Sequence, residues 1–220
     1  VLILDELDDA FISLPPWPFR TLRALRDEWQ GRLALVISTS RRLERLRPEA
    51  SVYEFREMFH TNTLMLQPLS QTDSRVCLQK LIEHHQIDLD EVGFVAVLAL
   101  AGGHPGFMKR ILLSISQLSP LPTRDEDWLP HLQNVWAIQQ ESQHLWEELE
   151  VEEQDALLAF TTGGLDAIDD VQRRALEMRG LLQPDASGKL EIFNLLFKVF
   201  LRNRMFRIRT MGTTGVQCDF

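Results

Sequence analysis

The sequence predicts an α/β fold at the N-terminal end of the chain, followed by a helical segment and by a small module of helices with one hairpin. Two continuous apolar runs, at residues 1–4 and 33–37, are separated by a helical pattern and by no hairpin turn. Strands joined through a helix pair in parallel, and a continuous apolar run suits a strand covered on both faces. After residue 70 the apolar positions keep helical spacing. We therefore expect a partial parallel sheet first and a mostly helical remainder.

Composition and charge exclude several classes of protein. The 220 residues are 45% hydrophobic and 25% charged, which is typical of a globular chain rather than a disordered or fibrous one. The net charge of −9 argues against broad nonspecific binding to nucleic acid or to an acidic membrane surface. The longest apolar stretch, 94–101, is far shorter than a membrane span, and no secretion signal is visible. Cys77 and Cys218 cannot form a disulfide framework, and we expect a cytoplasmic location.

The first third of the chain carries the predicted sheet. Its segments are a strand at 1–4, a proline-rich loop at 14–18, a helix at 19–29 ended by Gly31, a strand at 33–37 and a third strand at 63–66. Three short strands cannot complete a layer covered by helices on both faces. We therefore expect the chain to start inside a domain, with the remaining strands preceding Val1.

The rest of the chain is predicted to be helical apart from one hairpin. Ser70 is the expected cap of the first helix, because Asp73 follows it at the spacing of a capping motif. The expected segments are helices at 71–86, 89–101 and 105–118, a break at 119–122, helices at 128–149, 151–161 and 168–179, a Gly163-Gly164 turn, a hairpin over 181–193 and a final helix at 194–204. The order helix, helix, hairpin, helix is typical of a winged-helix module. The tail, 211–220, is expected to be a linker or the start of a further domain.

Asp5 and Glu6 follow the first strand directly. The carboxyl ends of parallel strands are where open α/β sheets bind ligands. In a nucleoside triphosphatase an aspartate at this position holds Mg²⁺, and the next glutamate can orient the attacking water. A pattern this short is also found where a strand end caps a helix, so both interpretations stay open.

Ser40 and Arg41 follow the second strand, and neighbouring parallel strands end at the same edge of a sheet. A hydroxyl or a guanidinium there could reach a phosphate beside Asp5, because arginine offers a fixed fork of donors to phosphate oxygens. The alternative is a cap at the end of the strand with a solvated arginine.

A glycine-rich corner, Ala101-Gly102-Gly103-His104-Pro105-Gly106, separates two predicted helices. Glycines end one helix, and proline opens the next at its first turn. The backbone can approach closely there, so that a flat ligand such as a purine could pack against it. The alternative for His104 is an ordinary surface or core histidine.

In this order and spacing the chain resembles the C-terminal two thirds of a P-loop ATPase of the AAA+/STAND superclass, as far as residue 205. The matching segments are Leu2-Ile3-Leu4-Asp5-Glu6 for the Walker B strand, Val36-Ile37-Ser38-Thr39-Ser40-Arg41 for the sensor 1 strand, Leu66-Gln67-Pro68-Leu69-Ser70 for the last core strand, and Gly103-His104-Pro105 for the adenine-contacting Gly-x-Pro motif. A winged helix after a helical lid is the order seen in STAND switches and in initiator-type ATPases.

The resemblance implies four parts. They are the C-terminal part of a P-loop NTPase core at 1–69, a helical lid at 70–125, a linker helix and winged-helix domain at 126–205, and a linker or the start of a further domain at 206–220. It also implies a cytoplasmic regulatory or signalling switch that binds ATP or ADP with Mg²⁺. In some similar bacterial ATPases a response-regulator-type DNA-binding domain follows at this point. Protein partners or self-association on activation are further expectations.

The same resemblance implies roles for individual residues. Asp5 would hold the metal, Glu6 would act on water, and Ser40 with Arg41 would lie beside the terminal phosphate. Gly103, His104 and Pro105 would contact the base.

One element of the resemblance is missing from the sequence. A Walker A loop needs Gly-x-x-x-x-Gly-Lys-Ser/Thr, so that backbone amides surround the phosphates. Only Lys189 follows a glycine, and Gln183 and Leu190 occupy the other required positions. The loop therefore either precedes Val1, which the truncated start favours, or has been lost. We expect residues 1–220 alone neither to bind ATP tightly nor to hydrolyse it.

Two other functions stay open. One is an initiator-type ATPase that binds DNA through its winged helix, which salt-dependent binding to duplex DNA would favour. The helix at 169–179 carries three arginines and three acids, whereas the stretch 197–209 holds five basic residues and no acid. The other is a nucleotide-free scaffold that binds partners through its winged helix and its acidic stretch, 141–155, although such a stretch also suits a solvated helix face. Metallohydrolase and serine-hydrolase motifs are absent from the sequence.

Overall fold

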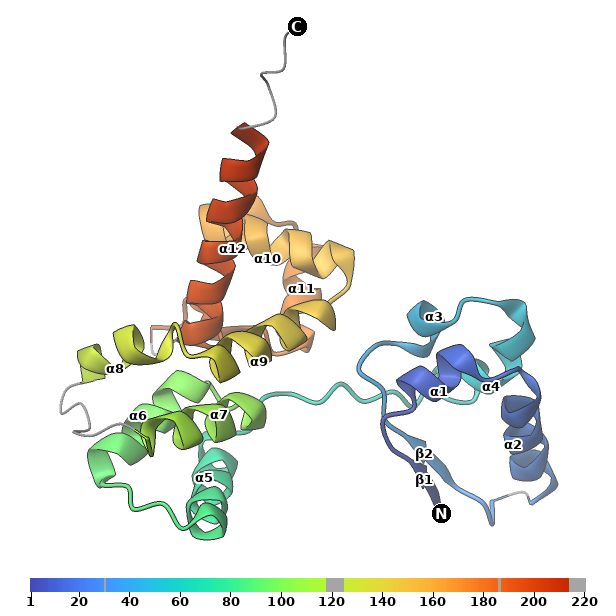
Figure 1. Cartoon of the computed structure of the whole chain (residues 1–220). Helices are drawn as coiled ribbons and strands as arrows, with labels where there is room; N and C mark the ends of the chain where they lie inside the picture. Colours follow the sequence, from blue (N-terminus) through green and yellow to red (C-terminus); the bar gives the residue numbers. More distant parts are fainter. Residues whose placement is uncertain (30, 118–124, 186, 214–220) are drawn as a thin grey trace, which may run out of the picture. The chain divides into compact units, whose positions relative to one another are not determined.

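The computed structural model describes residues 1–29, 31–117, 125–185 and 187–213. The described residues are mostly helical and include two sheets of two strands each (Figure 1). The chain divides into two compact units, Val1–Met65 and Leu66–Phe220. Among the described residues, no helix combines the length and the apolar character that crossing a membrane requires.

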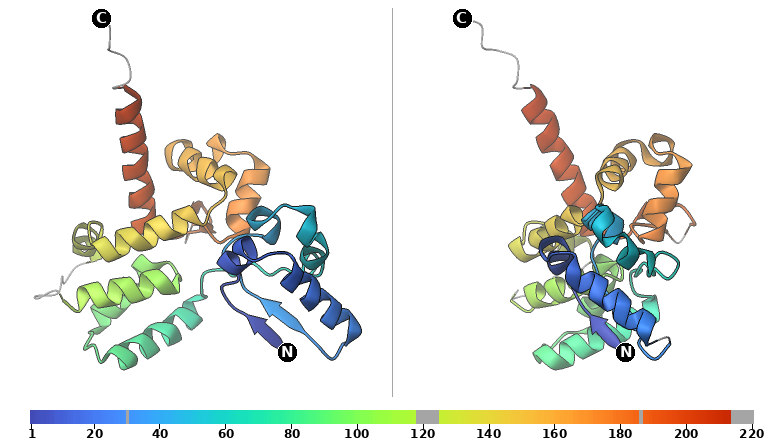
Figure 2. Two further views of the ribbon diagram at one scale, coloured as in Figure 1. Left: turned by 45° about the vertical axis from the view of Figure 1, so that its right-hand side comes forward. Right: turned by 90° about the vertical axis from the view of Figure 1, so that its right-hand side faces the viewer.

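The first unit contains the predicted parallel pair. Strand β1 (Leu2–Leu4) pairs with β2 (Leu35–Ile37) in parallel, and Ile3 lies opposite Val36. The connection between them holds α1 (Asp8–Ser13) and α2 (Trp17–Glu28), and Figure 2 shows the strands side by side. The remaining elements of this unit are α3 (Leu43–Leu46), the 3₁₀ helix η1 (Ala50–Val52) and α4 (Tyr53–Glu57). The parallel pairing predicted from the sequence is confirmed.

An aromatic cluster forms the core of this unit. The rings of Phe11, Phe19 and Phe55 lie 4.9 to 5.8 Å apart between centroids, and all three are fully buried. Arg47 fixes the end of α1, because its Nη1 donates to the carbonyl oxygens of Phe11 at 3.1 Å and Leu14 at 2.6 Å. These contacts hold α1 in place and thereby position its first residue.

Three expectations for this unit are wrong. The strands are not covered on both faces, since Ile3 is 68% exposed and Val36 is 51% exposed, while Leu4 and Ile37 pack on the core. The run 63–66 forms no strand, and Leu64 is 83% exposed, because no neighbouring strand among the described residues offers it a ladder. The proline-rich loop is shorter than expected, because α2 begins at Trp17 and tolerates Pro18 in its first turn.

The second unit holds eight helices, one 3₁₀ turn and a hairpin within its described residues. They are α5 (Gln71–His85), α6 (Glu91–Ala101), α7 (Pro105–Ile115), α8 (Asp125–Leu132), α9 (Trp136–Glu147), α10 (Val151–Gly163), η2 (Gly164–Ala167), α11 (Asp170–Met178), β3 (Leu182–Pro184), β4 (Leu190–Ile192) and α12 (Leu195–Thr213). Strands β3 and β4 pair antiparallel, as predicted. Ser70 caps α5 as expected, since its side chain accepts from the amide of Asp73 at 3.1 Å.

Two helix boundaries differ from the prediction. The single helix expected at 128–149 is two helices, because Val135 takes an extended conformation between α8 and α9. The side-chain amide of Gln139 donates to the carbonyl of Gln133, which the break leaves outside the helix. The final helix continues to Thr213 rather than ending at 204. The expected break at 119–122 and the tail from 214 onward lie outside the described residues.

One hydrophobic core runs through the whole second unit, from Leu78 on α5 to Leu201 on α12. Helices α6 and α7 meet at the glycine-rich corner, and α12 packs against α6, α9 and α10 (Figures 1 and 2). The corner and the hairpin are therefore parts of one packed body. The contacts around the corner come from α9, from the end of β4 and from residues 68 and 69 before α5.

Candidate functional site

Ser38 joins the carboxyl ends of β1 and β2. Its amide donates to the carbonyl of Leu4 at 3.0 Å, and its carbonyl accepts from the amide of Leu7 at 3.0 Å. Its hydroxyl donates to a carboxylate oxygen of Asp5 and accepts from the amide of Glu6 at 2.9 Å. The side chain that follows β1 is thus held directly against the residue that follows β2.

Glu6 has an uncommon backbone conformation. Its φ of 50° lies in the left-handed region, and among the described residues Gln86 is the only other non-glycine residue there. Such a conformation persists where surrounding contacts impose it. Here the hydrogen bond from the Glu6 amide to the Ser38 hydroxyl does so. The chain turns sharply between Asp5 and α1, and the side chains of Asp5 and Glu6 stay exposed to solvent.

Ser40 is held by Asp8, the first residue of α1. The carboxylate of Asp8 accepts from the amide of Ser40 at 3.0 Å and from its hydroxyl at 2.6 Å. Arg41 follows in the chain and is half-buried. The structure thus brings Asp5, Glu6 and Ser40 together at one edge of the sheet, as the sequence predicted for the ends of parallel strands.

Sequence reasoning missed Asp8. Its signal was an acid in the first helical turn, three residues after Asp5, but the motif ends at Glu6 and gives no role to this position. Because the hydroxyls of Ser38 and Ser40 donate to Asp5 and Asp8 respectively, both serines are engaged by carboxylates. Arg41 is then the one cationic side chain of the predicted set.

The carboxylates at this edge match what Mg²⁺ uses in proteins. Mg²⁺ is usually bound by one or two carboxylates together with water and substrate phosphates, and not by an all-protein cage. Asp5 and Asp8 offer such oxygens, each already oriented by a serine. Within the described ranges, no group of three or more ligating side chains converges on one point.

The second group of predicted residues lies at the corner between α6 and α7. Gly102 and Gly103 have φ of 57° and 79°, which glycine adopts without strain. His104 caps α7, because its Nδ1 accepts from the amide of Phe107 at 3.4 Å. Pro105 is the first residue of α7 and is exposed.

Protein atoms cover this corner closely. A Cβ added to Gly102 would lie 2.0 Å from the carbonyl oxygen of Phe193, and one on Gly103 would lie 2.5 Å from that of Leu69. A Cβ on Gly106 would lie 1.7 Å from Oε1 of Glu141. The close backbone approach predicted from the glycines is therefore present, and the partners that make it are segments of this chain.

The neighbours of His104 favour a neutral imidazole that caps α7. Its ring lies 5.3 Å from the ring of Phe107 and 6.0 Å from that of Phe193, and its Nδ1 lies 3.9 Å from a carboxylate oxygen of Glu141. Burial lowers the pKa of His104, and the Glu141 carboxylate opposes this effect. Glu141 also faces Arg110, whose Nε is 3.6 Å away. A neutral imidazole can accept the amide of α7, which a doubly protonated one cannot.

The predicted site residues belong to two different units. Asp5, Glu6, Ser40 and Arg41 lie in the first unit, whereas Gly103, His104 and Pro105 lie in the second.

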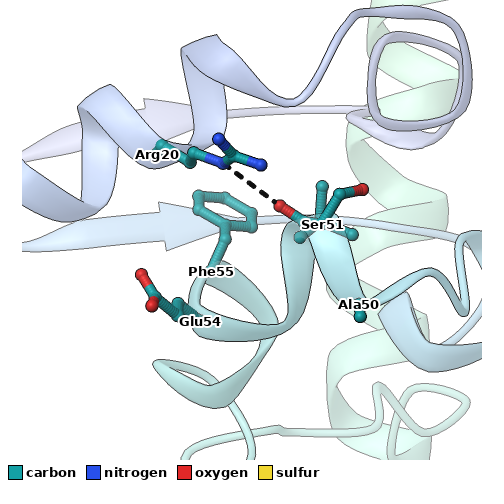
Figure 3. A pocket seen from close by; sticks show the side chains of 6 residues that line it. Arg20, Ala50, Ser51, Glu54 and Phe55 are labelled. Atoms are coloured by element: carbon teal, nitrogen blue, oxygen red, sulfur yellow. Dashed lines mark hydrogen bonds between the residues drawn. The ribbon is translucent and has the colours of Figure 1, made fainter.

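A small pocket of about 270 Å³ lies beside α2 and α4 in the first unit (Figure 3). The guanidinium of Arg20 spans it and donates to the carbonyl of Ser51 at 3.5 Å. Its lining residues are Arg20, Ala50, Ser51, Val52, Glu54 and Phe55. None of them belongs to the predicted site, and the pocket adds no catalytic group to it.

Comparison of the chain with models of protein families, with curated proteins and with solved structures found no match in any of the three. A functional assignment therefore depends on the chemistry of the residues themselves.

Proposed function

We propose that this chain is the C-terminal part of an ATP-dependent molecular switch of the AAA+/STAND type. Its first unit would be the end of a P-loop NTPase core, residues 70–125 the helical lid and residues 126–205 the linker helix and winged-helix domain. One observation carries the proposal most directly. The Ser38 hydroxyl links Asp5 at the end of β1 to the end of the parallel neighbour β2, and a Walker B strand beside a sensor 1 strand would bring these two strand ends together.

In the intact protein, bound Mg²⁺ would neutralise charge on the phosphates of ATP. Asp5 would hold the metal, and Glu6 would orient the attacking water. Arg41 would donate to the terminal phosphate, because the Ser40 hydroxyl is already engaged by Asp8.

Three cations of the proposed winged helix support an internal role rather than DNA reading. Arg173 pairs with Asp170 at 3.3 Å, and Arg179 pairs with Glu153 at 3.3 Å. Lys198 on α12 pairs with Glu191 of β4. A cation already paired within the fold contributes less to neutralising a phosphate backbone. These contacts favour a winged helix that acts on the rest of its own chain.

The test begins with the coding sequence upstream of Val1. We expect Gly-x-x-x-x-Gly-Lys-Ser/Thr there, within one or two βαβ units. The longer chain should hydrolyse ATP, and Asp5→Asn should reduce the rate at least about a hundredfold, which is typical of losing a key transition-state interaction. Glu28→Gln on the exposed face of α2 is the control and should keep the rate. An upstream sequence without that motif, or an Asp5→Asn rate equal to the parent's, would contradict the proposal.

Residues 1–220 offer a separate test. Calorimetry should give no micromolar binding of ATP or ADP, because the phosphate-binding loop is absent from this sequence. Salt-dependent binding of duplex DNA by the same chain would favour the initiator-type alternative.

A further inference from the structure

Residues 67–69, which we call the strap, precede α5 in the second unit and have no regular secondary structure. The amide of Leu69 donates to the carbonyl of Gly103 at 2.8 Å. The side-chain amide of Gln67 donates to the carbonyl of Met178, at the end of α11. The strap therefore bonds at the same time to the corner between α6 and α7 and to the corner between α11 and β3.

Two glycines form the surface on which the strap sits. Gly103 has φ of 79°, and a Cβ there would lie 2.5 Å from the carbonyl oxygen of Leu69. Gly180 has φ of 68°, and a Cβ there would lie 2.2 Å from Cδ of Pro68. Each corner thus lacks a side chain at the point where the strap crosses it, so the strap fits only while both positions are glycine.

The chain that enters the strap is not held by the core. Leu66 immediately precedes it and is 85% exposed, and residues 63–66 form no helix or strand. Displacement of this entering segment would therefore act first on the few hydrogen bonds and glycine contacts of the strap. Segments with few buried apolar contacts open before the core does.

We propose that the strap is a conformational device that couples the two corners. When the strap is bound, it holds the α6–α7 corner and the α11–β3 corner in their packed conformation. When it dissociates, both corners become more mobile together, although they are far apart in sequence. This coupling depends only on the contacts of the second unit and stands independently of the proposed ATPase.

Gly180→Ala tests the coupling against a matched control. Gly164 also has a φ of 68°, but a Cβ there would meet nothing within 4 Å, so Gly164→Ala introduces a side chain at a positive φ without a steric clash. The measurement is hydrogen–deuterium exchange of the full chain. Gly180→Ala should raise exchange of the Leu69 amide and of residues 102–104 at least about tenfold, whereas Gly164→Ala should leave both unchanged.

The hairpin also joins the two corners, because the amide of Phe193 donates to the carbonyl of Leu181 at 3.0 Å and the carbonyl of Phe193 lies against Gly102. Gln67→Ala, which removes a contact of the strap alone, is therefore measured beside Gly180→Ala.

Exchange raised only around residues 178–183, or raised equally by both glycine variants, would overturn the proposal. If Gly180→Ala fails to fold, Gln67→Ala serves alone, because that variant removes one strap contact without adding an atom. It should raise exchange at Leu69 and at residues 102–104 by several-fold, and an unchanged rate at either place would count against the strap.

Discussion

Asn194 is a small polar side chain whose removal should strongly lower the free energy of unfolding of the second unit. It is fully buried between β4 and α12. Its Nδ2 donates to the carbonyl of Ala101 at 3.0 Å, and its Oδ1 accepts from the amide of Phe197 at 2.9 Å. One side chain therefore caps α12 and ties it to the end of α6.

The cost of Asn194→Ala follows from these two bonds. A buried amide left without an acceptor costs roughly 1–3 kcal/mol, and the lost bond to Ala101 adds about 1 kcal/mol. The carbonyl of Ala101 still accepts from the amide of His104, so it is not left unpaired. We expect the free energy of unfolding to fall by about 2–4 kcal/mol.

The assay is urea unfolding followed by tryptophan fluorescence, because Trp128 and Trp146 are both buried in this unit. Asp169→Ala removes the exposed cap of α11 and should cost only about 1 kcal/mol. Asn194→Asp keeps the acceptor for Phe197 but turns an oxygen toward the carbonyl of Ala101, so it should also destabilise the unit strongly. The reasoning would be refuted if Asn194→Ala cost no more than Asp169→Ala.

Three further predictions test other contacts. Burial lowers the pKa of His104 in the folded state, so the unfolded state takes up a proton first as the pH falls. The free energy of unfolding should therefore be highest above about pH 6.5 and decrease below it. In urea titrations, His104→Asn, which keeps an acceptor for the helix cap, should show a weaker dependence of that free energy on pH. Phe55→Ala should cost the first unit about 3–5 kcal/mol by thermal unfolding, against less than about 1 kcal/mol for the exposed Tyr53→Ala. Ser38→Ala should raise exchange of the Glu6 amide several-fold while Ser13→Ala leaves it unchanged, since only Ser38 accepts from that amide.

Local rules predicted much of the fold. The helix between two apolar runs was enough to predict the parallel pairing of β1 and β2, because a hairpin cannot join parallel strands. The serine and acid at 70 and 73 predicted the start of α5, and the two short apolar ends within 181–193 predicted the hairpin. The start of α5 and the hairpin depend on residues close in sequence, whereas the β1–β2 pairing joins distant residues such as Ile3 and Val36 and followed from the connection between the strands.

The failures concern features that local patterns do not specify. A run such as 63–66 is apolar enough for a strand, but a strand exists only through its neighbours, and propensity alone does not supply them. The break at Val135 contains no glycine or proline, so the sequence carries none of the usual signals for it, although the Gln139 side chain donates to the nearby carbonyl of Gln133. The link between Asp8 and Ser40 joins residues on different elements. The candidate site was predictable as strand ends, whereas its hydrogen bonds were not.

The bare side of the β1–β2 ladder has a practical consequence for every measurement proposed above. Ile3 and Val36 form an exposed apolar patch on a two-stranded sheet. Within the part of the chain that the structure describes, each strand of this sheet has an unpaired edge, and such edges promote association with further chains. The net charge of −9 opposes this clustering at low salt, but added salt screens that repulsion. Light scattering should therefore show larger particles as protein concentration and ionic strength rise together, and a lysine in place of Val36 should suppress them.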